Sequence, residues 1–230
     1  MADAVDIANI ALSHLGDDAT VSSFDPPEGS IQAEHCARWY PIARDNLLEM
    51  YDWSFASRRA PLVEVDFPFA QWAHSYVQPN NCLRVRAILD PEAVDDDSSG
   101  YPNGGISSNT VITGLYDLRN AASGYYTPQP FVLETDASER KLILTNQADA
   151  ICRYTERVEN PGRFSPLFTD ALGWLLAAYL AGPVLKGAAG RQAGRECQAE
   201  FRAMLSAASV SDANQSMTRI NHAVPWVANR

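Results

Sequence analysis

The four histidines of this chain are the side chains best suited to acid–base chemistry at neutral pH. They are far apart in the sequence, at His14, His35, His74 and His222. A hydrolase needs a nucleophile beside a base, and the GxSxG sequence of many serine hydrolases does not occur. We therefore predict that the chain is not an enzyme and has no catalytic residues. His14 falls at the end of a predicted helix, where a protonated imidazole would interact favourably with the negative helix terminus.

Cysteines and a run of aspartates are the candidates for metal binding. The cysteines are Cys36, Cys82, Cys152 and Cys197. They are isolated, without the CxxC spacing of a zinc or redox site, so we interpret them as small buried hydrophobic residues. The run from Asp95 to Asp97 offers oxygen atoms for calcium, but the bidentate glutamate of a helix–loop–helix calcium site does not follow it. We predict a solvated loop there, no metal site and no cofactor.

Residues suited to binding are concentrated at one helix exit, where Trp53 and Phe55 precede Arg58 and Arg59. Two guanidinium groups beside aromatic rings are suited to bidentate pairing with carboxylates of a neighbouring subunit. The two aromatic residues either complete the end of the hydrophobic core or contact another part of an assembly. We predict a subunit or domain interface made by all four residues. The aromatic rings would seat the β-rich part of the chain against the helices, and the arginines would face a neighbouring copy.

The charge balance limits the partners of the chain. It has 18 basic and 28 acidic residues, which give a formal net charge of -10. Such a chain is poorly suited to clamping DNA by neutralising phosphates. The N-terminus, with Asp3 and Asp6, lacks the basic start of a signal peptide, and we find no apolar run that approaches the roughly 18 residues of a membrane span. We expect a protein made in the cytoplasm, with no membrane partner.

Two helices are predicted near the N-terminus. Asp3 is placed to cap the first, and Gly16 is placed to end it. Ser30 is placed to cap a second, longer helix that contains Pro41. Because proline lacks the amide hydrogen of a helical bond, we predict a kink near Pro41 within a single helix.

Two further helices are predicted after residue 160. Ser165 caps the first of them, and Gly182-Pro183 loosens its end. The last helix is expected at about 191–208, after a turn marked by Gly187 and Gly190. Its arginines, Arg191, Arg195 and Arg202, lie on a different face from its apolar residues and are interpreted as a solvated stripe.

Between these helices the pattern changes to short alternating strands. The predicted strands are 83–89, 111–116, 131–134, 141–145 and 151–158. Short turns separate the last three, so we predict that they form a meander. The segment 90–109 is predicted to be a loop that projects from the sheet.

The predicted fold is therefore α+β, with a discontinuous helical bundle and an inserted antiparallel β domain. We assign residues 1–60 and 161–210 to the helical bundle and 61–160 to the β-rich insert. Residues 211–230 are predicted to form an extended C-terminal arm. The arm is polar until Val224, Pro225, Trp226 and Val227, which we predict to dock on a partner.

Three blocks of sequence resemble the tail tubular protein A family, the head-to-tail adaptors of short-tailed bacteriophages. The first block is Tyr40-Pro41, Arg44-Asp45, Leu47-Leu48, Trp53 to Ala56 and Arg58 to Leu62. The second is Tyr76, Pro79 and Asn81 to Val85, and the third is Tyr154 to Val158, Phe164, Pro166, Phe168, Ala171-Leu172 and Leu175 to Leu180. The order and spacing of the blocks carry the resemblance, which covers most of the chain except Asp90 to Pro130 and, more loosely, the far C-terminus.

The resemblance implies a structural virion protein that forms a ring, of twelve copies in this family, between the portal and the tail nozzle. The implied partners are other copies of the chain, the portal protein, the tail nozzle protein and double-stranded DNA, which would pass through the ring without sequence-specific binding. The segment 224–227 would dock on the portal. Twelve copies would place on the order of -120 formal charges around the passage, which would keep DNA from adhering to its wall.

Other functions are compatible with parts of the sequence. A different phage neck or head-completion protein is one alternative, although neck proteins of long-tailed phages are more often all-helical. A tail-borne cell-wall hydrolase would lose its activity on removal of one acid, such as Glu134 or Glu156. A bacterial binding module unrelated to phages is a further alternative, and portal and tail genes beside this one would argue against it.

Overall fold

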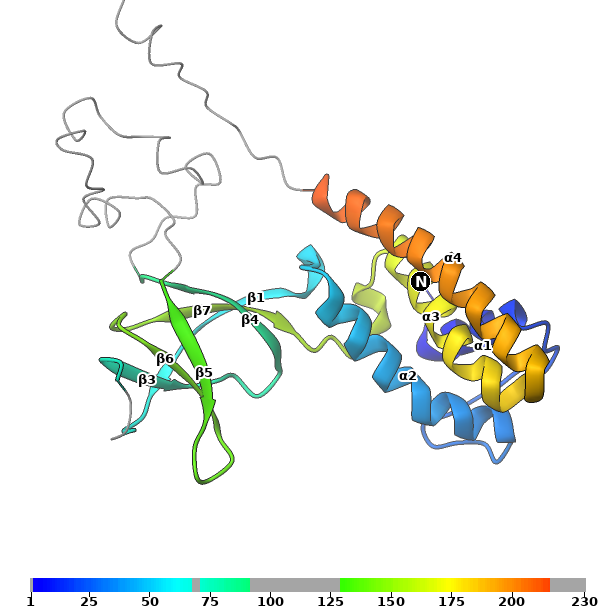
Figure 1. Ribbon diagram of the computed structural model, residues 1–230, viewed down its shortest axis with the longest axis horizontal. Coiled ribbons are helices and arrows are strands. Elements are labelled where there is room, and N and C mark those ends of the chain that lie inside the picture. The colour runs from blue at the N-terminus through cyan, green and yellow to red at the C-terminus, as the bar shows by residue number, and fades with distance from the viewer. Residues whose placement is uncertain (1, 68–70, 92–128, 216–230) are drawn as a thin grey trace, which may run out of the picture. The chain divides into compact units, whose positions relative to one another are not determined.

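The computed structural model describes residues 2–67, 71–91 and 129–215. They form an α+β fold, which confirms the predicted fold class. The chain divides into a helical unit, Met1–Ser57 with Thr155–Ser216, and a β unit that contains Arg58–Tyr154 (Figure 1). The predicted boundaries after residues 60 and 160 lie three residues beyond Ser57 and six residues beyond Tyr154. The predicted strand 111–116 and residues 92–109 of the predicted loop lie outside the described residues.

The first helix, α1, covers Ala4–His14 and has the predicted cap. The carboxylate of Asp3 accepts a hydrogen bond from the backbone N–H of Asp6 at 2.7 Å. The carboxylate of Asp6 accepts one in return from the backbone N–H of Asp3 at 2.9 Å. This reciprocal capping box satisfies two amide groups that a helix start leaves unpaired. Gly16 follows the helix with a φ of 71°, a conformation that glycine adopts at little cost.

The second helix, α2, covers Ile31–Met50 and continues through Pro41 as a single element. Its predicted cap is also present, since the hydroxyl of Ser30 accepts a hydrogen bond from the backbone N–H of Ala33 at 3.1 Å. Cys36, Tyr40, Ala43 and Leu47, which follow one another at helical spacing, are buried.

The central helix of the helical unit is α3, Pro166–Leu185, which contacts α1, α2 and the last helix, α4, Gly187–Ala213 (Figure 1). By length and composition alone, α3 is apolar enough to cross a membrane, contrary to the expectation that no apolar run approaches that length. Half of this apolar stretch (50%) is buried inside the protein. A helix that is apolar on most sides is typical of a core or of a membrane span, and packing against three helices accounts for the composition of α3.

The helix α4 is longer than the predicted 191–208 and begins directly after a turn at Lys186 and Gly187. Gly187 marks the turn as predicted, with a φ of 59° directly after Lys186, whose φ is 55°. Gly190 lies within the helix and is buried against α3. A Cβ atom added at Gly190 would lie 2.6 Å from the carbonyl oxygen of Ala181. The glycine therefore permits a close approach of two helix backbones, a tertiary role that local sequence does not distinguish from helix punctuation.

We predict that Gly190→Ala destabilises the helical unit by about 1 to 3 kcal/mol, because the backbone of α3 would have to move away from the added methyl group. Gly182→Ala is the matched control, since nothing lies within 4 Å of its Cβ position. Alanine there should stabilise α3 by up to about 1 kcal/mol through its higher helix propensity. Chemical denaturation measures both effects. Equal stabilities of the two variants would contradict the close packing at Gly190.

The strands of the β unit form two sheets. The described strands are β1 (Ser57–Pro61), β2 (Val63–Glu64), β3 (His74–Val77), β4 (Cys82–Leu89), β5 (Phe131–Thr135), β6 (Lys141–Thr145) and β7 (Ile151–Glu156). One sheet has the order β1-β7-β4 and the other the order β2-β3-β6-β5. In the second sheet β6 is antiparallel to both neighbours, and Ile143 lies opposite Leu133 of β5 and Tyr76 of β3.

The predicted meander of the last three strands is wrong, because β7 leaves the sheet of β5 and β6 and pairs in the other sheet. Cys152 and Tyr154 of β7 share one buried hydrophobic cluster with Tyr76 and Ile143 of the second sheet. A short turn thus permits a hairpin, but burial of two apolar sheet faces against each other separates the strands into two layers.

Candidate assembly surfaces

Trp53 belongs to the core of the helical unit. Its side chain is fully buried, and its indole N–H donates a hydrogen bond to the backbone carbonyl of Leu47 at 2.8 Å. The ring packs edge-on against Phe168 of α3, with centroids 5.0 Å apart and an interplanar angle of 87°. A buried indole is not available to a neighbouring subunit. Of the two roles left open by the sequence, the structure therefore places Trp53 in the core of the helical unit.

Phe55 is half-buried and joins the same aromatic cluster. Its ring packs edge-on against Phe168 at 5.0 Å and lies 5.8 Å from the ring of Phe164. Its backbone carbonyl accepts a hydrogen bond from Nη2 of Arg163 at 2.8 Å. The other terminal nitrogen of Arg163 binds the carboxylate of Glu156, also at 2.8 Å. Arg163 thus joins the segment where the chain leaves the helical unit to the segment where it returns.

Arg58 and Arg59 lie on β1 and are exposed, as an interface role requires. Both also take part in interactions within the chain. Their pairing with a neighbouring copy remains a prediction. The predicted docking residues Val224, Pro225, Trp226 and Val227 lie outside the described residues.

The end of α4 is anchored to the helix exit by Asp212, a residue that sequence reasoning did not select. Its carboxylate is buried and accepts hydrogen bonds from the backbone N–H of Ser54 at 2.9 Å and from the Ser54 hydroxyl at 2.7 Å. The helix α4 therefore includes residues 211–213, the first three residues of the predicted arm. A single aspartate in a polar stretch gives no sequence signal for a contact with a residue 158 positions away.

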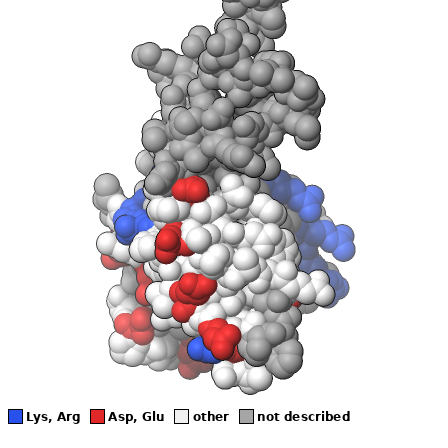
Figure 2. Space-filling view, turned by 90° about the vertical axis from the view of Figure 1, so that its left-hand side faces the viewer, with Lys and Arg blue, Asp and Glu red and all other residues white. Residues whose placement is uncertain are grey.

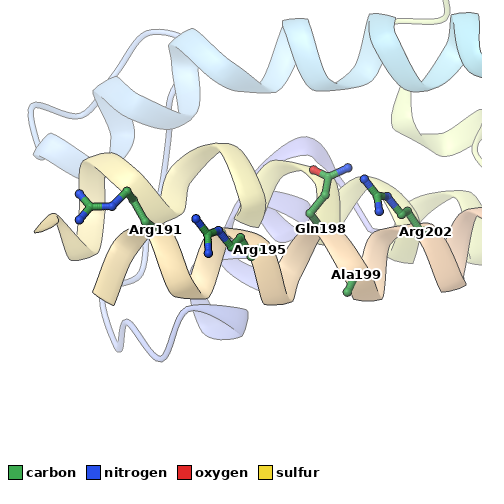
Figure 3. Close-up of a pocket in the computed structure, with 6 residues that line it drawn as sticks. Arg191, Arg195, Gln198, Ala199 and Arg202 are labelled. Carbon is green, nitrogen blue, oxygen red and sulfur yellow. The ribbon is translucent and has the colours of Figure 1, made fainter. Parts of the chain in front are cut away.

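The exposed arginines of α4 form a defined surface, which we call the α4 arginine stripe: Arg191, Arg195, Gln198 and Arg202. Their spacing of four, three and four residues places all four side chains on one face of the helix (Figure 3). Together with Gly194 and Ala199 they line an open hollow along α4. The three arginines are exposed, which confirms the predicted solvated stripe.

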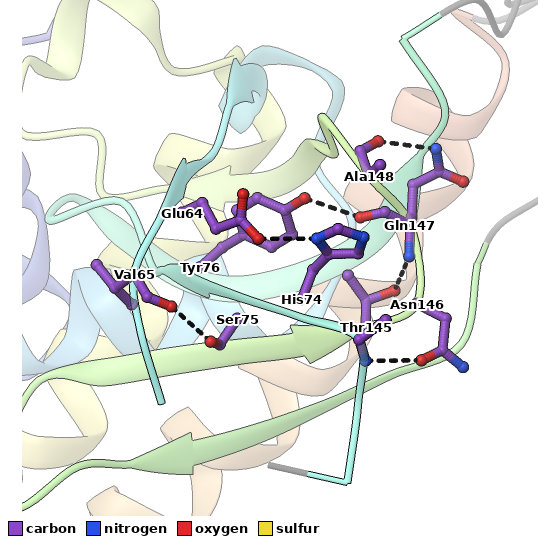
Figure 4. A network of polar contacts seen from close by, with 10 residues as sticks. Glu64, Val65, His74, Ser75, Tyr76, Thr145, Asn146, Gln147 and Ala148 are labelled. Atoms are coloured by element: carbon purple, nitrogen blue, oxygen red, sulfur yellow. Dashed lines mark hydrogen bonds and ion pairs between the residues drawn. The ribbon is translucent and has the colours of Figure 1, made fainter. Parts of the chain in front are cut away.

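His74, in the β unit, has a carboxylate within hydrogen-bonding distance. Its Nδ1 lies 2.8 Å from Oε1 of Glu64, and the two residues join β3 to β2 (Figure 4). The neighbouring Ser75 donates its hydroxyl hydrogen to the backbone carbonyl of Val65 at 2.7 Å. Because successive strand residues point to opposite faces, this hydroxyl is not placed beside the imidazole. The pair links two strands and does not activate Ser75 as a nucleophile.

The two carboxylates named for the hydrolase alternative have different surroundings. Glu134 is exposed on β5. Glu156 is bound to Arg163.

Within the part of the chain that the structure describes, no group of three or more His, Cys, Asp and Glu side chains is arranged to hold a metal ion. The cysteines are buried, as predicted, and burial raises the pKa of Cys36 to about 11 and that of Cys152 to about 12.

His14 stacks on Trp174 of α3, with ring centroids 3.7 Å apart and an interplanar angle of 6°. Burial lowers the pKa of His14, and the negative charge of Asp170 opposes this effect. The lowered pKa disfavours the protonated ring that a favourable interaction with the end of α1 requires. The stack on Trp174 is a packing role that the sequence did not indicate.

The lowered pKa of His14 predicts a pH dependence of stability. The unfolded chain takes up a proton near the ordinary histidine pKa of about 6.5, whereas the folded chain takes it up at lower pH. The contribution of the neutral ring is therefore fully present above about pH 6.5 and is lost as the pH falls toward the folded pKa. His14→Phe keeps a ring against Trp174 and should remove this component. Identical pH profiles of wild type and variant between pH 7 and 5, measured by urea denaturation, would contradict the assignment.

Acidic side chains are exposed on the β unit as well. They are Glu64, Asp66, Glu134, Glu139 and Asp149. Figure 2 shows acidic side chains along the face that it presents. Arg58, Arg59, Arg140 and Lys141 are exposed on the same unit, so its described surface carries charges of both signs.

Comparison with protein-family models and with curated proteins gives no match to this chain.

Proposed function

We propose that the chain is a structural virion protein, a head-to-tail adaptor that forms a ring between the portal and the tail nozzle. The ring would be built from about twelve copies, each contacting its neighbours by the same heterologous interface. The protein would be made in the cytoplasm of the host bacterium and end in the neck of the virion. No reaction, cofactor or membrane is part of the proposal.

The observation that carries the proposal is the packing of the residue blocks that resemble adaptor proteins. Trp53 and Phe55 of the first block contact Phe168 of the third block, and Phe55 also contacts Phe164. These residues are more than 100 positions apart in the sequence, yet they form one aromatic cluster where the chain leaves and rejoins the helical unit. The resemblance thus covers a physically connected set of residues, which supports a shared architecture more than separate matches would.

Two further observations favour an assembly role. Two of the side chains considered for catalysis have structural partners in the described residues. His74 pairs with Glu64 and links two strands, and Glu156 binds Arg163. Neither arrangement presents a nucleophile to a substrate. The net charge of -10 suits a wall past which a polyanion must move.

Co-sedimentation with the portal protein of the same virus tests the proposal. The purified chain should sediment with portal assemblies at a fixed ratio, and an unrelated acidic protein of similar size should not. Failure to co-sediment at both low and high ionic strength would contradict an adaptor role. Because a neck protein could also bind near the portal, a ring seated directly on the portal is required to separate the two functions.

A further inference from the structure

The α4 arginine stripe places positive charge on a chain whose net charge is -10. None of its three arginines has an acidic residue three or four positions away along α4. Arg191 and Arg195 are themselves four residues apart, and like charges at this spacing cost about 0.2 to 0.5 kcal/mol on an isolated helix. Among the described residues, no hydrogen bond or ion pair links these guanidinium groups to a carboxylate. The described part of the chain therefore leaves the charge of the stripe unbalanced.

The opposite charge is concentrated at the start of the same helical unit. Residues 1–37 contain seven acidic residues and no lysine or arginine. The seven are Asp3, Asp6, Asp17, Asp18, Asp25, Glu28 and Glu34. All of them except Asp17 belong to the exposed class. We call residues 2–34 the N-terminal acidic segment, and it comprises α1, the connection after it and the first turn of α2.

The two charged surfaces lie on different helices of one unit. The helices α1, α2 and α4 each contact the central helix α3. No ion pair within the described residues joins the N-terminal acidic segment to the stripe. A unit with one basic surface and a separate acidic surface is suited to a heterologous contact, in which two different surfaces of identical copies meet. Repetition of such a contact generates a ring when the rotation closes.

We propose that the α4 arginine stripe of one copy binds the N-terminal acidic segment of a second copy. The inference rests on the proposed ring and identifies the surfaces at which its subunits meet. With a rise of 1.5 Å per residue, the stripe extends about 16 Å from Arg191 to Arg202, long enough to bind several carboxylates. Guanidinium groups pair with carboxylates in a bidentate manner. Duplex DNA is the other polyanion that such a stripe fits, but the remaining surface of this acidic chain repels it.

Charge reversal on the full chain tests the proposed contact. The stripe variant carries Arg195→Glu and Arg202→Glu. The matched control carries Arg38→Glu and Lys186→Glu, which change the net charge equally at two other exposed positions of the helical unit. Sedimentation velocity, alone and with portal, should show self-association of wild type and control that weakens as salt is added. The stripe variant should self-associate at least about tenfold more weakly at low ionic strength.

A compensating variant separates a lost contact from a misfolded chain. Asp18→Lys with Glu34→Lys reverses two exposed positions of the N-terminal acidic segment. This variant should also self-associate weakly by itself, because its new lysines face the arginine stripe of the next copy. Mixing it with the stripe variant should restore association, since the new lysines of one chain then meet the new glutamates of the other, and the unchanged stripe and segment also pair.

Three outcomes would overturn the proposed contact. One is equal self-association of the stripe variant and the control, and another is a wild type that stays monomeric both alone and with portal. The third is salt-dependent binding of a short DNA duplex that only the stripe variant loses while its self-association is unchanged. Rings that form without portal binding would contradict the adaptor function alone. Portal binding by a chain that never self-associates would contradict only the contact proposed here.

Discussion

Replacing Trp53 with alanine is expected to destabilise the helical unit by about 3 to 5 kcal/mol, the usual range for a large aromatic residue of a protein core. The indole is fully buried and packs edge-on against Phe168. Its removal would leave a cavity and would deprive the carbonyl of Leu47 of its hydrogen-bond donor. Because whole domains are stable by only about 5 to 15 kcal/mol, much of the stability of the unit would be lost. Denaturation in guanidinium chloride measures the change.

Two variants serve as controls for Trp53→Ala. Trp53→Phe should have an intermediate stability, because it keeps an aromatic ring against Phe168 and loses the indole N–H. Phe55→Ala should cost less than Trp53→Ala, since Phe55 is only half-buried. A Trp53→Ala chain with wild-type stability that fails to assemble would place Trp53 at a subunit interface after all, and would contradict its assignment to the core.

Removal of residues 216–230 is expected to abolish portal binding and to leave the stability of the helical unit nearly unchanged. The deleted residues include the predicted docking segment 224–227. The cut leaves the contact between Asp212 and Ser54 intact, because α4 ends at Ala213 and the described chain at Gln215. Co-sedimentation with portal and denaturation of the truncated chain check both parts. A truncated chain that still sediments with portal would show that docking does not depend on this segment.

A cut after Val210 is the informative comparison, because it also removes Asp212. The backbone N–H and hydroxyl of Ser54 would lose their buried carboxylate partner, at a cost of about 1.5 to 3 kcal/mol. Asp212→Ala in the full chain should lose a similar amount of stability and still bind portal. If both the longer cut and Asp212→Ala left stability unchanged, the anchoring of α4 at Ser54 would be refuted.

The helices could be predicted from the sequence because their signals are local. The caps Asp3, Ser30 and Ser165 each precede an apolar periodicity, and each accepts the expected backbone hydrogen bond. The length of α4 could not be predicted, because two long-range contacts determine it. One is the close approach of Gly190 to Ala181, and the other is the anchoring of its end at Ser54.

The strands could be predicted only where apolar alternation is clear. The predicted strands 83–89, 131–134, 141–145 and 151–158 correspond to β4, β5, β6 and β7, each with an end shifted by at most two residues. The strands β1, β2 and β3 were missed, since β1 consists of Ser-Arg-Arg-Ala-Pro and β2 of two residues. Neither sequence has a pattern long enough to mark a strand. The pairing of the strands also depends on contacts between distant parts of the chain. For example, β7 pairs with β1 and β4 and not with β6, the strand before it.

The candidate surfaces were predictable to different extents. The arginine stripe follows from residue spacing alone, and its exposure agrees with that prediction. The aromatic residues at the helix exit were conspicuous, but the sequence could not decide whether Trp53 is buried. Its burial depends on Phe168, a residue 115 positions further along the chain. Hydrophobicity alone does not separate a core aromatic residue from an interface aromatic residue, because both environments favour the same side chains.

Electron microscopy of the purified chain, alone and mixed with its portal protein, tests the central claim most directly. The account predicts closed rings of about twelve copies seated on the portal, joined by one repeated heterologous contact. Rings that form only with portal would agree with this account equally well, because an incomplete interface need not offset the entropy of ordering the chain. A chain that stays monomeric and apart from the portal at low and high ionic strength would contradict it.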